Sequence, residues 1–517
     1  MPDQELLSQL YLKLGGSEAP SDLVSQIHSV NVDQSLLIPS MFVLRIQDPE
    51  MRWVDSDLFR LGQEVEISAR SLDREQAWLI TGDITAIEPE YPEEGVPTVV
   101  VRGYDRLGRL ARGTRSRTFV EVTDSDIVSR IANEYGLRAE TGNTRTVHPH
   151  VYQDNVSDLT FLRERARLIG FILTAERNVL KFKPFRDAGT ANVQLKYGSS
   201  LLSFRPCVTA AHQADSVVVR GWDYEKKDVV VSEQSPSGWP NAGAVSNENA
   251  SGVLGEAQFV WAGGDVAAAS FADSVAGGMK VAVEESKVQA DGMALGNPAI
   301  RAGCTISVEA VGRRFSGDYF VTSALHTFET RGRYETHFGV TGLQTGTVRE
   351  LLVDPGISGE RSGRLLSEPV VGVVSNIEDP SNLGRVKVRF PWLSDSDETG
   401  WARVAGPMTG PDRGFFNLPE VDDEVLVVFV NGSFDHPVVV GGLWNGNDRP
   451  PNAASALSGG RVVQRLWKSR SGHLILLDDS DGSENIQIVD KSGQNKITID
   501  TSGGEISLKS QQAVSIE

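Results

Sequence analysis

Cysteine is scarce in this chain of 517 residues, which contains only Cys207 and Cys304. Two thiols cannot build a disulfide framework, so the sequence predicts buried thiols and synthesis in a reducing cytoplasm. Apolar runs such as residues 425–430 are far shorter than the roughly 20 residues of a membrane-spanning helix. Acidic Asp3 and Glu5 occupy positions where a secretory signal would have basic residues, so no export signal is expected.

Positive charge is also in short supply. Lys and Arg number 50 against 69 Asp and Glu, so the formal net charge is −19 at pH 7, and a trimer would have three times this charge. Residues 370–450 alone contain six basic and twelve acidic residues. Such a surface repels phosphate backbones and anionic lipids, which argues against nucleic acid as a partner.

Long segments with apolar residues at helical spacing are rare. Short valine-rich runs that alternate apolar and polar residues, together with 51 glycines, predict a mainly β protein. Helices are expected near residues 127–135 and 159–169, where apolar residues recur at helical spacing and a glycine follows. The alanine-rich segment 265–292 predicts a third helix, which the pair Gly277-Gly278 weakens.

One short motif is repeated along the chain. VVVRGYD at residues 99–105 returns as VVVRGWD at 217–223, with six of seven positions identical. Valine-rich strands that end in a glycine turn can resemble one another by chance. Similar strands near each copy, at 78–87 and 319–328, favour instead two related β-barrel domains within residues 1–360. Residues 232–264, rich in Ser, Asn, Gly, Ala and Pro, are expected to be a loop or strand insertion in the second barrel.

Residues 365–447 have the pattern of a small closed barrel. A cluster of Pro, Gly and Ser at 354–363 precedes them and predicts a domain boundary. Five short strands suit a barrel of the oligonucleotide/oligosaccharide-binding (OB) type. They are expected at 370–377, 384–390, 401–404, 423–430 and 437–443. The Pro/Asn/Ala/Ser/Gly-rich composition that follows predicts a linker over 448–471.

The tail, residues 472–517, contains apolar pairs at alternate positions separated by polar turns. The pairs start 11, 9 and then 8 residues apart. Each such strand buries little by itself, so we expect three chains to wind together as a triple-stranded β-helix whose apolar side chains face the threefold axis. An ordinary β-hairpin cap on the barrel is the alternative. The predicted needle core consists of Ile486, Ile488, Ile497, Ile499, Ile506, Leu508, Val514 and Ile516.

An ordered series of motifs runs along the chain. It begins with YQDN at 152–155, DLTFL at 158–162 and GF at 170–171, and continues with GNP at 296–298, FSGDY at 315–319 and His326. It ends with GRVKVRFPW at 384–392, WARV at 401–404, GFF at 414–416 and HP at 436–437. Over essentially the whole chain, this series resembles the valine-glycine repeat protein G (VgrG) and phage hub-and-needle spike family.

The resemblance implies a homotrimer in which two pseudo-equivalent barrels per chain form a ring of six that matches a hexameric inner tube. Below the ring, the small barrels and the β-helix would form a spike within the baseplate proteins, capped by a small tip protein. Sheath contraction would drive the spike through a target envelope, so a membrane is met only by mechanical puncture. The protein would be made in the cytoplasm and released in the particle, as a structural part with no cofactor, metal or catalytic residue.

Three contexts share this architecture: type VI secretion, phage baseplates and phage-like extracellular contractile particles. The segment 36–48 and the compact small barrel look closest to the spikes of extracellular particles, which is the context we favour.

A cell-wall-degrading enzyme and a glycan-binding spike are the rival classes. The linker leaves no room for an inserted catalytic domain, and no Gly-rich phosphate loop precedes a helix. The pair His148-Pro149-His150 lacks further ligands, so an exposed loop rather than a metal site is expected there. Aromatic residues of the small barrel could stack on sugars or bases, although core and trimer contacts are the simpler expectation. They are Phe390, Trp392, Trp401, Phe415 and Phe416.

Overall fold

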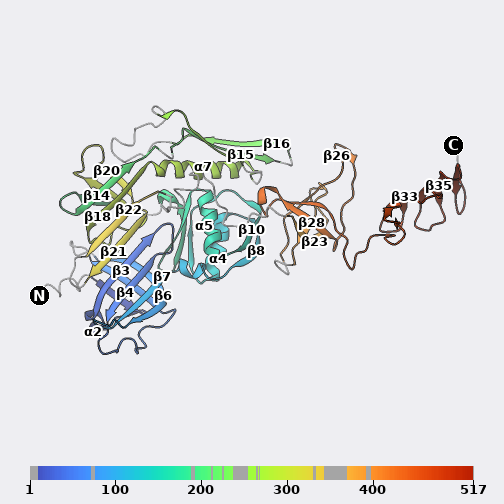
Figure 1. The fold of residues 1–517 in the computed structure, drawn as a ribbon. Helices are drawn as coiled ribbons and strands as arrows, with labels where there is room; N and C mark the ends of the chain where they lie inside the picture. The colour runs from blue at the N-terminus through green and yellow to red at the C-terminus, as the bar shows by residue number, and fades with distance from the viewer. Residues whose placement is uncertain are drawn as a thin grey trace.

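The computed structural model describes residues 10–70, 76–187, 192–210, 213–223, 226–236, 254–262, 266, 268–329, 334–342, 369–391 and 397–515. Strands dominate these ranges, and the chain is elongated, with the N-terminal strands at one end and the C-terminal strands at the other (Figure 1). All helices within the ranges are too short or too polar to span a bilayer. We call residues 10–342 the hub, 370–442 the small barrel and 464–509 the ribbon.

An eleven-stranded sheet with antiparallel neighbours is the largest sheet of the described hub residues. The pair β21–β3, in which His326 lies opposite Val32, joins the strands from residues 201–340 to the strands from residues 10–105. Strands far apart in sequence are therefore joined into one surface. The order is β14 (Leu201–Val208), β18 (Val288–Leu295), β22 (Glu335–Val340), β21 (Ser323–Glu329), β3 (Ile27–Ser35), β4 (Met41–Gln47), β7 (Thr98–Asp105), β6 (Gln76–Glu90), β5 (Glu64–Arg70), β1 (Leu10–Leu14) and β2 (Ser17–Glu18).

Two hydrophobic cores lie along this sheet, one in each lobe. The first gathers around Phe42, Ile67 and Val101, with the short helix α2 (Ser21–Ser25) at its edge. The second gathers around Ile306 and Phe338, where β13 (Asn192–Lys196), β19 (Thr305–Glu309) and β20 (Gly317–Phe320) add a three-stranded sheet. A mainly β hub with two barrel-like lobes is confirmed.

The repeated motif does not mark corresponding strands of the two lobes. Its first copy is β7 in the large sheet, whereas its second copy is β15 (Ser216–Asp223) in a separate sheet with β16 (Asp228–Gln234) and β17 (Gln258–Ala262). In both copies the glycine lies where neighbouring atoms leave no room for a side chain. A Cβ would come within 2.3 Å of the Phe42 ring at Gly103 and within 1.9 Å of the Val266 carbonyl oxygen at Gly221. Most of the insertion predicted at 232–264 lies outside the described residues.

A layer with two helices joins the lobes to the rest of the chain, around a third core. Its helices are α4 (Asp124–Glu134) and α5 (Asp158–Leu168), and the short α3 (Leu107–Leu110) lies beside them. Gly136 and Gly170 follow α4 and α5 with φ of +67° and +69°, so both predicted helices and their glycine ends are confirmed. The strands of this layer are β8 (Arg115–Val122), β9 (Arg138–Thr141), β10 (His148–Val156), β11 (Phe171–Glu176) and β12 (Val179–Pro184).

The third predicted helix is α7 (Ala269–Ser286), which packs against β15 and β16. The predicted range ran too far, because β18 starts at Val288. The glycine pair lies inside the helix and permits a close helix crossing. A Cβ at Gly278 would lie 2.5 Å from the Leu168 carbonyl oxygen at the end of α5, whereas one at Gly277 would meet nothing closer than 3.8 Å.

The small barrel has the five predicted strands, in the order β24 (Lys387–Arg389), β23 (Val370–Asn376), β28 (Glu424–Phe429), β29 (Pro437–Gly442) and β25 (Arg403–Val404). Val386 and Ala402 close it by two backbone hydrogen bonds of 2.9 and 2.7 Å. A hairpin of β26 (Thr409–Gly410) and β27 (Arg413–Gly414) projects from it. Trp392 and the boundary at 354–363 lie outside the described residues.

The ribbon is a meander of five consecutive antiparallel strands, each five residues long. They are β32 (Gln464–Lys468), β33 (Leu474–Asp478), β34 (Asn485–Val489), β35 (Lys496–Asp500) and β36 (Glu505–Lys509). A hairpin of β30 (Leu457–Ser458) and β31 (Arg461–Val462) precedes it. The ribbon thus begins inside the segment 448–471 that was expected to be a linker.

Candidate functional site

A buried carboxylate ties together the elements that connect the hub to the small barrel. Asp158 is the first residue of α5, and its side chain is 1% exposed. Its Oδ1 accepts hydrogen bonds from Arg117 Nη2 at 2.6 Å and Gln153 Nε2 at 2.8 Å. Its Oδ2 accepts one from the Tyr135 hydroxyl at 2.8 Å. The YQDN and DLTFL motifs therefore supply a structural cluster, in which loss of the carboxylate would leave buried partners unsatisfied.

A second buried carboxylate, Asp124, begins α4. Arg165 donates to its Oδ1 at 2.6 Å, and His148 Nε2 lies 3.1 Å from its Oδ2. Burial pushes the pKa of Asp124 upward, but the positive charge of Arg165 and the contact with His148 outweigh it and lower the pKa to about 2. This ion pair fixes α4, α5 and β10 relative to one another.

The expectation of an exposed loop at His148 and His150 is wrong. Both residues belong to strand β10, and their side chains are only 9% and 8% exposed. The strand runs from the hub toward the small barrel, so His148 meets Asp124 in the hub while His150 contacts Asp435 near the small barrel. The two imidazoles have no ligand in common. Across the described parts of the chain, no three His, Cys, Asp or Glu side chains converge as a metal site.

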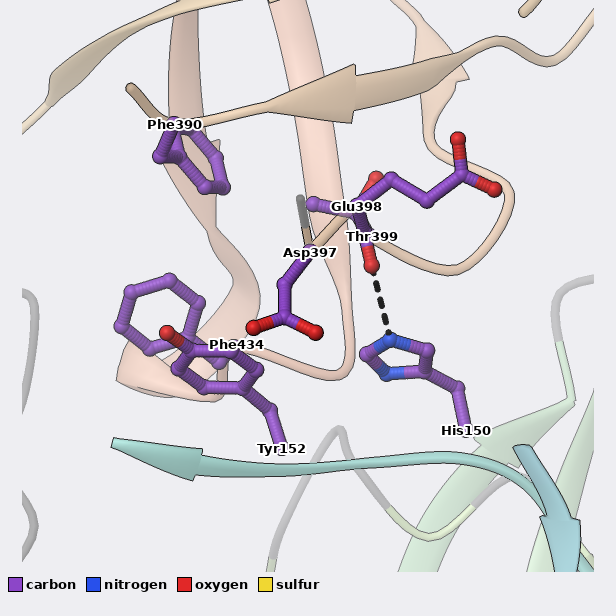
Figure 2. Close-up of a pocket in the computed structure, with 7 residues that line it drawn as sticks. All are labelled: His150, Tyr152, Phe390, Asp397, Glu398, Thr399 and Phe434. Atoms are coloured by element: carbon purple, nitrogen blue, oxygen red, sulfur yellow. Dashed lines mark hydrogen bonds between the residues drawn. The ribbon is translucent and has the colours of Figure 1, made fainter. Parts of the chain in front are cut away.

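The contact between β10 and the small barrel forms a joint, and Figure 2 shows Tyr152 and His150 pointing from one strand toward residues of the small barrel. The Tyr152 backbone N–H donates to Asp435 Oδ1 at 3.0 Å. The Tyr152 ring lies against Phe434, with ring centroids 4.6 Å apart, and the Thr118 hydroxyl donates to Asp397 at 3.1 Å. Tyr152 also packs against the core of the small barrel. Polar and aromatic contacts thus hold the barrel to the hub.

The cavities at this joint are too small for a substrate. The one lined by His150, Tyr152 and Phe434 has a volume of about 10 Å³, the lower limit for one water molecule. A second, lined by Trp222, Trp401 and residues of the barrel, has about 80 Å³ and could hold a few waters. Ligand pockets are several times larger, so neither of these two cavities would enclose a substrate.

A further buried ion-pair cluster, which the sequence did not predict, lies between the first lobe and the helical layer. Arg106, with its side chain 3% exposed, forms ion pairs with Asp83 and Glu64. Its Nε also donates to the side chain of Asn178, between β11 and β12, at 2.9 Å. The sequence contains no periodic signal for such a residue, because its partners come from strands distant in sequence.

The ribbon places most of the predicted needle residues on one face. Ile486 lies opposite Ile499, and Ile488 lies opposite Ile497. Leu508 and Ile506 extend these two rows on β36. All six side chains are between 40% and 72% exposed in the single chain. Val514, 52% exposed, lies beyond the last strand, and Ile516 lies outside the described residues.

The apolar face continues onto strands that the sequence prediction missed. Ile475 and Leu477 on β33 lie opposite Ile488 and Ile486 and are 41% and 44% exposed. Trp467 on β32 lies opposite Ile475 and is 50% exposed. Extending the alternating pattern backward across Gly472 would have found them. The result is one uncovered apolar surface that runs over all five strands of the single ribbon.

Two protein-family models match the chain. The model described as the Alg8 N-terminal domain matches residues 5–330. The model described as the type VI secretion system/phage-baseplate injector OB domain matches residues 370–444, which coincides with the small barrel.

Individual relatives share either a segment or the fold. The type VI secretion system spike protein VgrG2a of Pseudomonas aeruginosa is 40% identical over 74 residues, which are 14% of this chain and only 9% of that relative's length. The Francisella PdpA–VgrG complex in its lidded form has a TM-score of 0.55 at 10% identity and covers 97% of this chain and 80% of that chain.

The E. coli c3393 protein, a component of the type VI secretion system with structural similarity to the T4 bacteriophage tail proteins gp27 and gp5, gives a TM-score of 0.52 at 13% identity. This match covers 84% of this chain and 99% of that chain. At such low identities the two solved structures establish a shared fold.

Proposed function

We propose that this chain, which belongs to the Alg8 N-terminal domain family and to the wider VgrG and phage hub-and-spike family, is the trimeric central spike of a contractile injection system. Its hub would sit on the inner tube, and its ribbon would form the needle that punctures the target envelope. The observation that supports this most is the uncovered apolar face of the ribbon, at the opposite end of the chain from the hub (Figure 1).

The physical argument starts from the single ribbon, which has no partner for this face. Complete burial of an aliphatic side chain is worth roughly 1.5–3 kcal/mol, and the five isoleucines and one leucine on β34 to β36 are 40% to 72% exposed. Two further copies of the ribbon would cover them around a threefold axis, and each covered position would count three times. Folding of the ribbon and association of the chains would then be one event.

The two lobes of the hub support a match to a sixfold tube. Each chain has two barrel-like lobes joined by one continuous sheet, so three chains would present six lobes in a ring. The joint at Tyr152 and the ion pairs of Asp158, Asp124 and Arg106 would keep the hub and small barrel aligned while force passes along the axis. Rigidity, not bond chemistry, is the proposed mechanism.

The proposal also covers the kind of particle that contains the spike and the proteins that surround it there. We favour a phage-like extracellular contractile particle over type VI secretion or a phage baseplate, with a hexameric tube protein and baseplate proteins around the hub. A small tip protein would cover the end of the needle. Electron microscopy of particles from the native host tests the context, because free sheathed particles, phage heads or neither separate the three.

Native mass spectrometry and light scattering of the full chain at micromolar concentration test the trimer. A stable trimer is expected, and a folded monomer at that concentration would overturn the needle. Truncation before Asp448 is the matched experiment: it removes the ribbon and should leave the hub and small barrel folded but more weakly associated.

A further inference from the structure

The imidazole of His150 lies between two hydrogen-bond acceptors at the joint. Its Nδ1 is 3.2 Å from Asp435 Oδ1 and its Nε2 is 3.2 Å from the Glu398 backbone carbonyl oxygen, and the second contact is the dashed line in Figure 2. A carbonyl and a carboxylate only accept hydrogen bonds. A neutral imidazole has one N–H, whereas the imidazolium ion has two. Only the doubly protonated ring can donate to both partners.

The carboxylate of Asp435 is in its ionised form. Burial pushes the pKa of Asp435 upward, but the hydrogen bond and charge of His150 outweigh this and hold the pKa below its usual range. The same oxygen also accepts the Tyr152 backbone N–H at 3.0 Å. The carboxylate therefore joins strand β10 to the small barrel through two donors, one of which depends on the protonation of His150.

We propose that His150 is a pH-dependent latch between the hub and the small barrel, closed when its imidazole is doubly protonated and weakened when one proton leaves. Loss of a proton leaves one of the two acceptors, Asp435 or the Glu398 carbonyl, facing a ring nitrogen that no longer donates. The cavity beside the ring holds about 10 Å³, so there is little room for a water molecule to take over the lost contact. The latch does not depend on the proposed spike function.

Several charged groups nearby have partners of their own, and Glu398, Arg165 and His436 also interact electrostatically with His150 or Asp435. The Glu398 carboxylate accepts from Lys387 at 2.5 Å and from the Ser375 hydroxyl at 2.9 Å. Arg165 is bound to Asp124. Burial raises the pKa of Tyr152, which keeps its hydroxyl neutral. The titratable or charged groups around the latch, from every element packed there, are Asp435, His436, Asp397, Glu398, Lys387, Arg165, Tyr152, His148 and Asp124.

The direction of the pH effect follows from the two donors. Both acceptors are satisfied only while the ring holds two protons, so the contact is complete at acidic pH and weakens as the pH rises. A hydrogen bond to a charged group changes an equilibrium by about tenfold or more. Opening of the joint should therefore become about tenfold more frequent between pH 5.5 and pH 8.5.

Hydrogen–deuterium exchange of the full chain, corrected for the intrinsic pH dependence of exchange, measures that opening. We expect peptides over 148–156, 397–399 and 434–437 to lose protection about tenfold as the pH rises, while peptides in the second lobe change little. His150→Gln should remove the pH dependence at the joint. His337→Gln is the matched control, because His337 is 49% exposed on β22 and lies 4.0 Å from its nearest acidic partner.

Two results would overturn the latch. One is joint protection in the unmodified chain that stays constant over this pH range, and the other is the same pH dependence in His150→Gln. If that variant fails to fold, exchange of the imidazole C2 proton in the unmodified chain decides instead. The pH profile of that exchange should follow the loss of protection in the joint peptides, and a profile that does not follow it would equally overturn the latch.

Discussion

The substitution Ile497→Asp distinguishes between two possibilities, a trimeric needle and a ribbon that remains single. Ile497 is 41% exposed in the single chain and lies between Ile488 and Leu508 on the neighbouring strands. Full burial of an isoleucine is worth roughly 1.5–3 kcal/mol, so covering the remaining 41% adds about 0.6–1.2 kcal/mol per chain. In a trimer the substitution removes this gain three times and brings three carboxylates together at the axis. Desolvation of these carboxylates costs several kcal/mol per ion.

A ribbon that remained alone would respond differently, because the new carboxylate would stay in water and cost only a few tenths of a kcal/mol. The control is Thr498→Asp, on the opposite pleat between the neutral residues Gln487 and Ser507. Thr498→Asp should change the stability of the tail little in either case.

Thermal melting, protease resistance of the tail and native mass spectrometry at neutral pH measure both variants. Ile497→Asp should fray the tail or dissociate the trimer, and its defect should shrink near pH 4 as the clustered carboxylates take up protons. Equal tolerance of the two substitutions, or the reverse ranking, would refute the threefold packing of this face.

Three further predictions concern the hub. Gly278→Ala should cost about 1–3 kcal/mol by forcing α7 away from α5, whereas Gly277→Ala should be neutral or stabilise by up to about 1 kcal/mol; denaturant unfolding compares them, and equal effects would contradict the close crossing. Asp105 is buried, and burial raises its pKa to about 7. Hub stability should thus fall by up to about 4 kcal/mol as the pH rises from about 4 to 7, and Asp105→Asn should flatten that slope in unfolding curves. Asp158→Ala should lower the free energy of unfolding by about 1–3 kcal/mol, because Gln153 and Tyr135 lose a buried acceptor while Arg117 keeps its ion pair with Glu134; a loss below about 0.5 kcal/mol would show that the cluster is dispensable.

Local sequence patterns were sufficient for the element types and several of their ends. Helix α4 follows from apolar spacing, and the Thr123 capping box and Gly136 at φ +67° bound it. The five strands of the small barrel also appeared where alternation and turn residues predicted them. The alternating apolar residues of the tail predicted one face, and five isoleucines and Leu508 lie on it. These features depend on residues within about ten positions of one another, so they can be read without knowing the fold.

By itself, then, the sequence determined the mainly β class, the small barrel and the apolar face of the ribbon. Only the tertiary structure decided that β21 pairs with β3 to make one sheet of both lobes, that the two copies of the repeated motif lie in different sheets, and that His150 is enclosed at the joint. The physical reason is that a side chain's period along its own strand reveals which face it occupies. The partner that covers that face is chosen by packing and hydrogen bonding between segments hundreds of residues apart, and no local pattern specifies it.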